Sequence, residues 1–306
     1  MRKTRRGSIL IVAIWTVAFL SALMVNVGVR SGMMVHAARQ LTDRTQMNQA
    51  AWAALEQGIA TLKERLRDGL KPKPAWEIQA DTFQVQDENR KVSLNSASSQ
   101  VLTALVTQVG GGTKTYTAQE IAAAIVDWRD VDDNPEPRGA ESSFYASLNP
   151  PYPCKNAPFE TVEELLLVRG IDFDFYLKFK EFVTVFGDGK VNLNTAASQV
   201  LQALGMSSGL STKISSFQKG PDGKLGTEDD GQFSSVASFP TELNASVPLS
   251  QSELSEATSL SGSGLLTVQS SFFQVKAQGR LAGKSQGREV RCIVDSNGHR
   301  VAWNEG

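Results

Sequence analysis

The stretch RRGSILIVAIWTVAFLSALMVNVGV, residues 5–29, joins a basic leader to a long apolar segment. Residues 8–29 are 22 positions without a charge, which is long enough to cross a hydrocarbon core of about 30 Å as a helix. Four of the first six residues are cations: Arg2, Lys3, Arg5 and Arg6. The positive-inside rule therefore places the N-terminus in the cytoplasm and everything after residue 29 on the other side of the membrane.

The junction between leader and apolar segment differs from an ordinary secretory signal, whose apolar region is shorter and ends in a small-residue cleavage site. Here the notable residues, Gly7 and Ser8, stand on the near side of the apolar run. This arrangement resembles the class III signal of type IV pilins and pseudopilins. The resemblance implies that a prepilin peptidase cuts between Gly7 and Ser8 and leaves the apolar segment on the mature protein.

An apolar stripe continues beyond the membrane segment at helical spacing: Ala51, Leu55, Gly58, Ile59, Leu62 and Leu66. No proline interrupts the chain between residue 8 and Pro72. The pattern predicts one helix from residue 8 to about residue 68, roughly 90 Å long. Because an apolar stripe in water must be covered, the second half of this helix is expected to pack on a folded domain.

Short strand-like runs lie at both ends of the remaining chain. Residues 82–86 alternate and are followed by residues 91–94, which together suggest a hairpin. The last forty residues contain three more strands, near residues 272–277, 288–294 and 300–303, divided by glycine-containing turns. We expect these strands to form an antiparallel sheet on the long helix.

An internal repeat lies between the two strand regions. VSLNSASSQVLTAL, residues 92–105, matches VNLNTAASQVLQAL, residues 191–204, at ten of fourteen positions. In each copy a β-like run and a polar turn precede an apolar-periodic segment, as when a strand enters an N-capped helix. The middle of the chain is therefore predicted to be a mostly helical insertion with two related units.

A block of sequence in the first unit, Asp127-Trp-Arg-Asp130 leading to Gly139-Ala-Glu141, completes a recognisable combination with the features above. Together they resemble the K-type minor pseudopilins of type II secretion systems. The resemblance implies an α+β, type IV pilin-like fold. The predicted organisation is a leader at 1–7, a transmembrane helix at 8–30, the first part of the pilin-like domain at 31–92, the insertion at 93–264 and the final strands at 265–306.

The resemblance also implies a role. K-type subunits are non-catalytic assembly proteins that form the tip of the pseudopilus and help to start its assembly for protein export. The expected location is the bacterial inner membrane, with the C-terminal domain in the periplasm. The expected partners are the I-type and J-type minor pseudopilins, the major pseudopilin, the prepilin peptidase and secreted cargo.

The fifth residue of the mature chain would be Val12, where most pilin-like subunits carry a glutamate that neutralises a neighbour's N-terminal ammonium. K-type subunits lack this glutamate, because a tip subunit has no neighbour above it. Val12 therefore argues against the major pseudopilin.

Two acidic segments are candidate calcium sites, since calcium takes six to eight hard oxygen ligands. The first candidate set lies in a segment broken by prolines and glycine and consists of Asp127, Asp130, Asp132, Asp133, Glu136 and Glu141. Its predicted ligands are Asp130, Asp132, Asp133 and Glu141. The second lies in residues 220–230, which resemble the Gly-Pro-Asp-Gly calcium loops of other pseudopilins, with predicted ligands Asp222, Glu228, Asp229 and Asp230. The alternatives are an acidic turn in water for residues 220–230 and neutralisation by Arg129 and Arg138 for the first set.

Cys154 and Cys292 both fall on the outward side of the membrane, where an oxidising periplasm permits a disulfide. A bond and two separate thiols both remain open from the sequence. The two histidines, His36 and His299, lie in no catalytic motif, and no nucleophile, metalloprotease or phosphate-loop pattern is present. The sequence therefore predicts a protein without enzymatic activity.

A helix-hairpin-helix element around Arg169-Gly170-Ile171 raises a different hypothesis, a DNA-binding or DNA-uptake protein. The body of the chain after the leader is mildly acidic, and Asp172 and Asp174 follow the hairpin where a phosphate-binding element would have lysines. Both observations favour docking of proteins and exclude nucleic acid as the expected partner.

Overall fold

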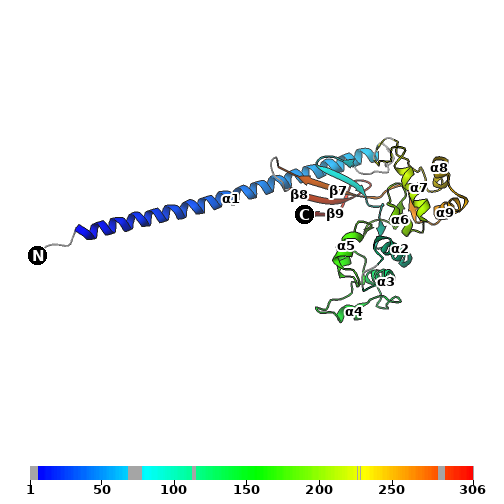
Figure 1. The fold of residues 1–306 in the computed structure, drawn as a ribbon, viewed down its shortest axis with the longest axis horizontal. Coiled ribbons are helices and arrows are strands. Elements are labelled where there is room, and N and C mark those ends of the chain that lie inside the picture. The colour runs from blue at the N-terminus through cyan, green and yellow to red at the C-terminus, as the bar shows by residue number, and fades with distance from the viewer. Residues whose placement is uncertain are drawn as a thin grey trace.

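A single long helix, α1 (Arg6–Arg67), projects from the folded body, which lies around its C-terminal half and beyond its end (Figure 1). The computed structural model describes residues 6–67, 78–111, 115–225, 227, 229–281 and 287–305. Residues 10–42 are exposed along the whole of that stretch. Among the described residues α1 is the helix that is long and apolar enough to cross a membrane.

A five-stranded antiparallel sheet packs against the second half of α1, in the order β1-β2-β7-β8-β9. Its strands are β1 (Ile78–Gln79), β2 (Phe83–Asp87), β7 (Phe272–Gly279), β8 (Arg288–Asp295) and β9 (Arg300–Glu305). Strand β2 lies beside β7 with Val85 opposite Val275. The sheet therefore joins the two ends of the folded part of the chain, and its C-terminal strands pack on the long helix as predicted.

The core between helix and sheet is built by the apolar stripe of α1. Leu55 and Leu62 are fully buried there together with Val85 and Val275. Gly58 permits the close approach of helix and sheet, because a β-carbon at this position would lie 2.8 Å from Cγ1 of Val275. Successive residues of a strand face opposite sides, so the other face of the sheet is left for polar side chains.

The insertion lies between β2 and β7. Its elements are β3 (Val92–Ser93), α2 (Ser99–Val109), α3 (Ala118–Arg129), α4 (Ser142–Ala146), η1 (Val162–Leu167), α5 (Phe173–Phe179), β4 (Val183–Thr184), β5 (Val191–Asn192), α6 (Ser198–Ala203), α7 (Ser208–Gln218), α8 (Phe239–Ser246), α9 (Gln251–Ser261) and β6 (Leu266–Thr267). Helices α2 and α6, one from each repeat, pack together, and both units share one hydrophobic core.

The predicted hairpin of residues 82–86 with residues 91–94 is wrong. Strand β3 pairs in parallel with β4 and not with β2. The chain is redirected after β2 by buried polar groups, because the Asp87 carboxylate accepts a hydrogen bond from the backbone N–H of Asn89 at 2.8 Å. Strand β6 likewise pairs in parallel with β5, so Leu266 and Thr267 belong to the insertion and not to the final sheet.

A buried polar cluster joins the second unit to the end of β2. The Asp87 carboxylate also accepts hydrogen bonds from the Asn192 amide at 3.0 Å and from the Thr195 hydroxyl at 2.6 Å. Burial raises the pKa of Asp87 above its ordinary value. The repeat is therefore anchored to the sheet by hydrogen bonds as well as by apolar packing.

The disulfide between Cys154 and Cys292 is not formed. Cys154 lies in the core of the insertion, whereas Cys292 lies on β8 in the core between sheet and helix. Two thiols in two separate cores cannot meet without moving one domain against the other. Burial raises the pKa of each thiol to about 11, so both are inert as nucleophiles.

Candidate metal centre

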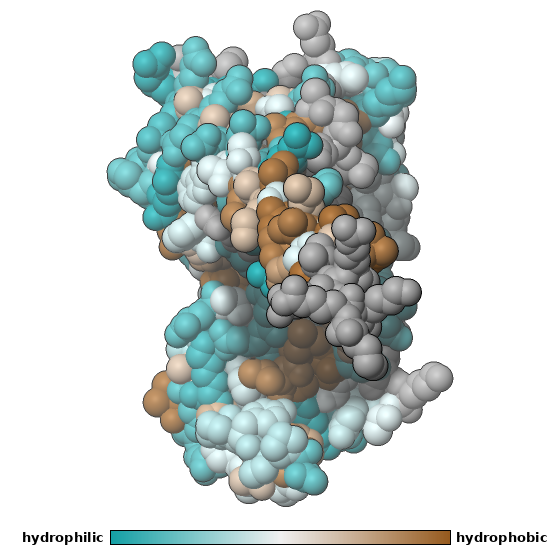
Figure 2. Space-filling model, turned by 90° about the vertical axis from the view of Figure 1, so that its left-hand side faces the viewer, coloured by the Kyte–Doolittle hydropathy of each residue, from teal (hydrophilic) through white to brown (hydrophobic). Residues whose placement is uncertain are grey.

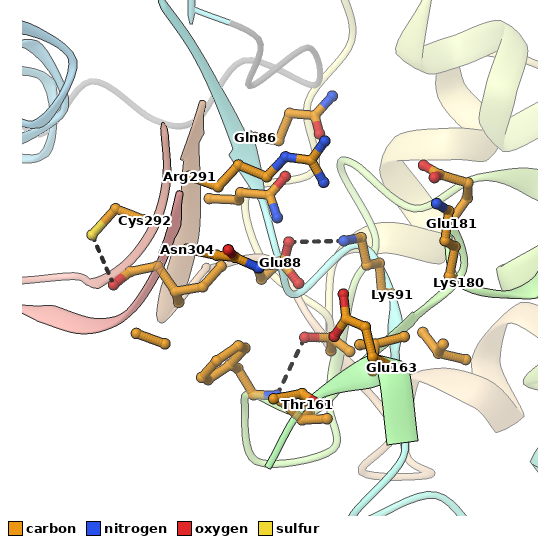
Figure 3. A pocket seen from close by; sticks show the side chains of 18 of the residues that line it. Gln86, Glu88, Lys91, Thr161, Glu163, Lys180, Glu181, Arg291, Cys292 and Asn304 are labelled. Atoms are coloured by element: carbon orange, nitrogen blue, oxygen red, sulfur yellow. Dashed lines mark hydrogen bonds and ion pairs between the residues drawn. The ribbon is translucent and has the colours of Figure 1, made fainter. Parts of the chain in front are cut away.

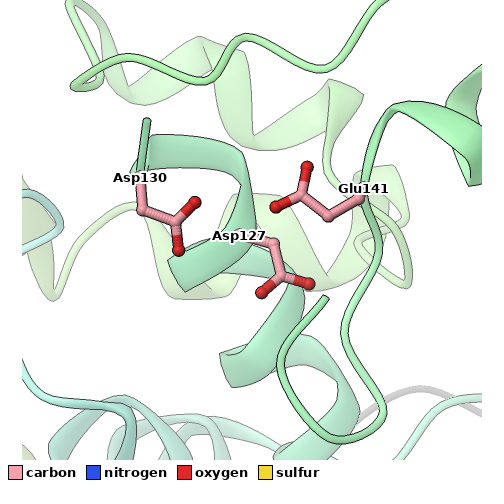
Figure 4. A group of neighbouring side chains, drawn as sticks. All are labelled: Asp127, Asp130 and Glu141. Atoms are coloured by element: carbon pink, nitrogen blue, oxygen red, sulfur yellow. The ribbon is translucent and has the colours of Figure 1, made fainter. Parts of the chain in front are cut away.

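Three carboxylates of the first unit converge at the end of helix α3. Asp127 and Asp130 come from the C-terminal end of α3, and Glu141 comes from the chain that returns past it (Figure 4). An oxygen atom from each lies within 4.8 Å of the other two. Asp127 and Glu141 are buried, and Asp130 is partly buried.

Local sequence sets up the helix that carries two of these side chains. Helix α3 begins with a capping box, in which Thr117 accepts from the backbone N–H of Glu120 and the Glu120 carboxylate accepts from the backbone N–H of Thr117. Asp127 and Asp130 are three residues apart, so they lie on one face at the end of the helix.

The loop after α3 brings the third carboxylate back. Asp127 accepts a hydrogen bond from the backbone N–H of Glu136 at 3.0 Å, which holds the loop against the helix. Gly139 then passes so close that a β-carbon would lie 1.8 Å from Oδ2 of Asp127. Only glycine fits there, and two residues later Glu141 faces the helix end.

The three carboxylates are short of partners. Oδ2 of Asp127, Oδ1 of Asp130 and both oxygens of Glu141 are buried without a hydrogen bond in the described part of the chain. Native proteins rarely leave such atoms unsatisfied, and an ion is one of the ordinary explanations. Burial, followed by the charges of Asp127 and Asp130, raises the pKa of Glu141 to about 7.

Burial also raises the pKa of Asp127 and of Asp130. The group is therefore a set of three neighbouring carboxylates that burial disfavours in their charged form. Hard oxygen donors in this arrangement suit calcium, which binds carboxylates in flexible geometry. The residues present fit the ion that the sequence predicts at this segment.

The three carboxylates that converge are not the same residues as the predicted ligands. Asp132 and Asp133 lie outside it: Asp132 accepts from the backbone N–H of Asn134 at 2.9 Å, and a hydrogen bond with Ser142 lowers the pKa of Asp133. Asp127 belongs to the group; it was a member of the acidic candidate set but not one of its predicted ligands. Its three-residue spacing from Asp130 on a helix was the signal for it.

The second predicted calcium loop uses its acidic side chains internally. The Asp229 carboxylate accepts from the backbone N–H of Asp222 at 3.1 Å and from the Thr227 hydroxyl at 2.7 Å, and the hydroxyl lowers the pKa of Asp229. Thr227 also donates to Asp230 at 3.2 Å. The predicted ligand Glu228 lies outside the described residues.

The hairpin between η1 and α5 does not present a phosphate site. The Arg169 guanidinium lies over the rings of Tyr116 and Phe144 and donates to the carbonyl of Gly139 at 2.8 Å. The Asp172 carboxylate caps α5 by accepting from the backbone N–H of Phe175 at 2.8 Å. The DNA-binding alternative is therefore not favoured.

A membrane-length helix whose second half packs on an antiparallel sheet defines the class of pilin-like proteins. One chain in the crystal structure of the GspK–GspI–GspJ complex from the enterotoxigenic Escherichia coli type 2 secretion system has a similar fold. The TM-score is 0.63 at 18% sequence identity, over 88% of this chain and 99% of that one.

Sequence comparison finds similarity to one family. The profile described as type II secretion system, protein K matches residues 79–188. The protein K of Pectobacterium carotovorum is 27% identical over 63% of this chain and 67% of its own length. The protein K of Pseudomonas aeruginosa is 35% identical over 30% of this chain and 28% of its own. The profile, the relatives and the structural match together support a type II secretion minor pseudopilin of the K type.

Proposed function

We propose that this chain forms the tip of a type II secretion pseudopilus and helps to initiate its assembly together with the I-type and J-type minor pseudopilins. The observation that carries the proposal is the bulky two-unit insertion on a pilin-like spine. A body of this size at the end of α1 suits the end of a filament better than its shaft (Figure 1). Val12 at the fifth mature position, where a stacked subunit needs a carboxylate, agrees with it.

Cleavage and anchoring complete the proposed pathway. The prepilin peptidase removes residues 1–7, α1 holds the protein in the inner membrane, and the folded body lies in the periplasm. The major pseudopilin extends the filament below, and exported cargo meets the tip. Mass spectrometry of the mature N-terminus tests the first step, with Ser8 as the expected first residue.

Tip placement is tested in cells that lack the chain. Wild-type protein should restore secretion and pseudopilus number, with antibody label confined to filament ends. Val12→Glu should restore them equally or less well at matched abundance, because no neighbour above needs its carboxylate and a buried charge near lipid costs free energy. Label along the wild-type shaft would contradict the proposal.

A calcium ion at Asp127, Asp130 and Glu141 is the second part of the proposed function. When bound, the ion would neutralise the three carboxylates and tie the 131–140 loop to the end of α3. The four buried oxygens without partners support this assignment.

Terbium, a luminescent stand-in for calcium, gives a direct test. Trp128 lies between Asp127 and Asp130 in the sequence, so excitation of tryptophan should sensitise terbium at this site, and calcium should displace it. Trp128→Phe should abolish the emission, while Asp222→Ala should leave it intact. Emission that survives Trp128→Phe but disappears with Asp222→Ala would locate the ion in the 220–230 loop instead.

A further inference from the structure

A groove of about 270 Å³ separates the sheet from the first unit of the insertion. Its floor is the face of the sheet turned away from α1, and its other wall comes from η1, α5 and β4. Figure 3 shows Gln86, Arg291 and Asn304 of the sheet on one side and Glu163 and Glu181 of the insertion on the other. The outline of the molecule narrows between two lobes in Figure 2.

The insertion and the sheet are two bodies with separate hydrophobic cores. Two short segments of chain cross between them, residues 88–91 after β2 and residues 268–271 before β7. Beside these crossings lie the polar cluster of Asp87 and a contact of the Phe186 and Phe272 rings, whose centroids are 6.0 Å apart. Bodies of one chain that meet without a large apolar interface are expected to move relative to one another. The crossings and these contacts therefore form a joint about which the insertion can rock against the sheet.

The floor of the groove carries a cation without a partner. Lys276 on β7 is partly buried, and its ammonium group makes no hydrogen bond or ion pair with any described residue. The strand register puts Lys276 directly opposite Arg291, which is itself paired with Glu289. Burial and then the charge of Arg291 lower the pKa of Lys276. An unpaired cation that is partly out of water costs free energy, and a carboxylate within reach would offset that cost.

Two carboxylates without partners stand on the opposite wall. Glu163 on η1 and Glu181 after α5 are exposed, line the groove and make no hydrogen bond or ion pair within the described part of the chain. Among the carboxylates near Lys276, Glu181 acts most strongly to raise the pKa of that lysine. Glu181 is therefore close enough to attract the ammonium group and still beyond the reach of about 4 Å that defines an ion pair.

Other charged side chains of the groove already have partners. Glu88 is paired with Lys91 at 2.8 Å, and a carboxylate oxygen of Glu160 lies 3.8 Å from the ammonium group of Lys155. Figure 3 shows the first of these pairs between the two walls. The unpaired charges of opposite sign therefore face one another across the groove.

We propose that the insertion rocks about the joint and closes the groove, so that Glu181 forms an ion pair with Lys276. Closing shortens the distance between the two charges and removes water from around them, and both changes strengthen their attraction. A single pair that stays partly in water contributes little, so the open and closed forms are both populated and salt favours the open form. The motion changes the angle between the insertion and α1. It depends neither on the calcium site nor on tip placement.

Double electron–electron resonance measures the motion in the full-length chain in detergent micelles. Spin labels are attached at Leu177→Cys on α5 and Glu64→Cys on α1, two exposed positions outside the groove. Cys154 and Cys292 are buried and should stay unlabelled. The distances between the labels should form two populations at low salt. The ratio of the shorter, closed population to the longer one should fall about fivefold at about 1 M salt, a difference of about 1 kcal/mol.

Variants test the ion pair itself. Glu181→Gln and Lys276→Gln should each reduce the ratio about fivefold and remove most of its dependence on salt, whereas Lys276→Arg keeps the charge and should keep the ratio. Asp174→Asn is the matched control, because it removes an exposed carboxylate from α5 and should change nothing. A single distance at every salt concentration, a ratio insensitive to Glu181→Gln and Lys276→Gln, or an equal effect of Asp174→Asn would each overturn the proposal.

Discussion

The two repeated units of the insertion share a set of hydrogen bonds that holds each unit together, and they differ in the side chains at the ends of their second helices. In the first unit the Asn95 amide accepts from the backbone N–H of Phe159 at 2.7 Å and donates to its carbonyl at 2.9 Å. In the second the Asn194 amide makes the same two bonds to Phe233, at 2.8 and 3.1 Å. Each repeated asparagine thus pins a later segment of its own unit to the strand that opens it.

The ends of the second helices show where the units diverge. Arg129 at the end of α3 donates to the carbonyl of Leu94, and Gln218 at the end of α7 donates to the equivalent carbonyl of Leu193 at 2.8 Å. Counting from these matched residues, the positions of Asp127 and Asp130 hold Ser216 and Lys219 in the second unit. The shared hydrogen-bonded frame therefore forms without the acidic group, and the three carboxylates of the first unit are an addition to it.

The largest expected effect concerns the asparagine that both units share. Asn194→Ala should lower the free energy of unfolding by about 2–4 kcal/mol, because the buried N–H and C=O of Phe233 would lose their partners. Asn95→Ala should cost less, since Asn95 is only partly buried and water can replace it.

Thermal unfolding of the full chain in micelles, followed by circular dichroism, measures both variants. Asn194→Asp keeps the acceptor and serves as an intermediate control. If Asn95→Ala cost more than Asn194→Ala, the equivalence of the two asparagines would be lost.

The second-largest expected effect concerns calcium binding by the acidic group, which the first unit has and the second unit lacks. Calcium at about a hundredfold excess over its dissociation constant should stabilise the protein by about 2.7 kcal/mol. The double variant Asp130→Asn with Glu141→Gln should abolish this gain, and Asp229→Asn in the second unit should retain it. A gain that disappears with Asp229→Asn alone would reverse the contrast between the units.

A smaller effect is the pH dependence of the metal-free protein. The pKa of Glu141 rises from 4.5 to about 7 on folding, so the folded state holds its proton more tightly than the unfolded chain. Stability from this group is therefore greatest below about pH 4.5 and is lost as the pH rises towards 7.

Melting temperatures between pH 4.5 and 7.5 in chelator measure this loss. Glu141→Gln should flatten the profile, and excess calcium should reverse its direction, because the ion favours the charged form. A wild-type profile that runs parallel to that of Glu141→Gln would show that the carboxylate is not perturbed.

Local periodicity explains which parts of the fold could be predicted. The stripe through Leu55 and Leu62, the strand alternation and the repeated asparagines are properties of short windows, and the structure agrees with them. Strand partners are not local. The pairing of β3 with β4 follows from a buried turn at Asp87 that no short window reveals.

The candidate metal site, too, could be predicted from the sequence only in part. Asp130 and Glu141 could be chosen from the density of carboxylates in one loop. Asp127 enters the group, and Asp133 leaves it, because of how the loop returns past Gly139. The separate positions of the two cysteines likewise depend on which core each strand joins, and sequence distance carries no information about that.

The smallest expected effect tests whether the first unit can use the helix end of the second. Arg129→Gln installs the residue that the second unit has at this position. The shorter amide can still donate to the carbonyl of Leu94, as Gln218 does to Leu193, but it loses the bond from Arg129 to the carbonyl of Ala97 at 2.6 Å. One lost hydrogen bond on a partly buried side chain should cost about 1 kcal/mol in the free energy of unfolding.

The same change, Arg129→Gln, removes a positive charge next to Asp130, so calcium should bind more tightly to the variant. Titration with calcium would show this as a lower dissociation constant. Gln218→Ala is the matched variant in the second unit, where it should destabilise the fold without altering calcium affinity. Weaker calcium binding by Arg129→Gln would mean that the guanidinium positions the carboxylates instead of competing with the ion for them.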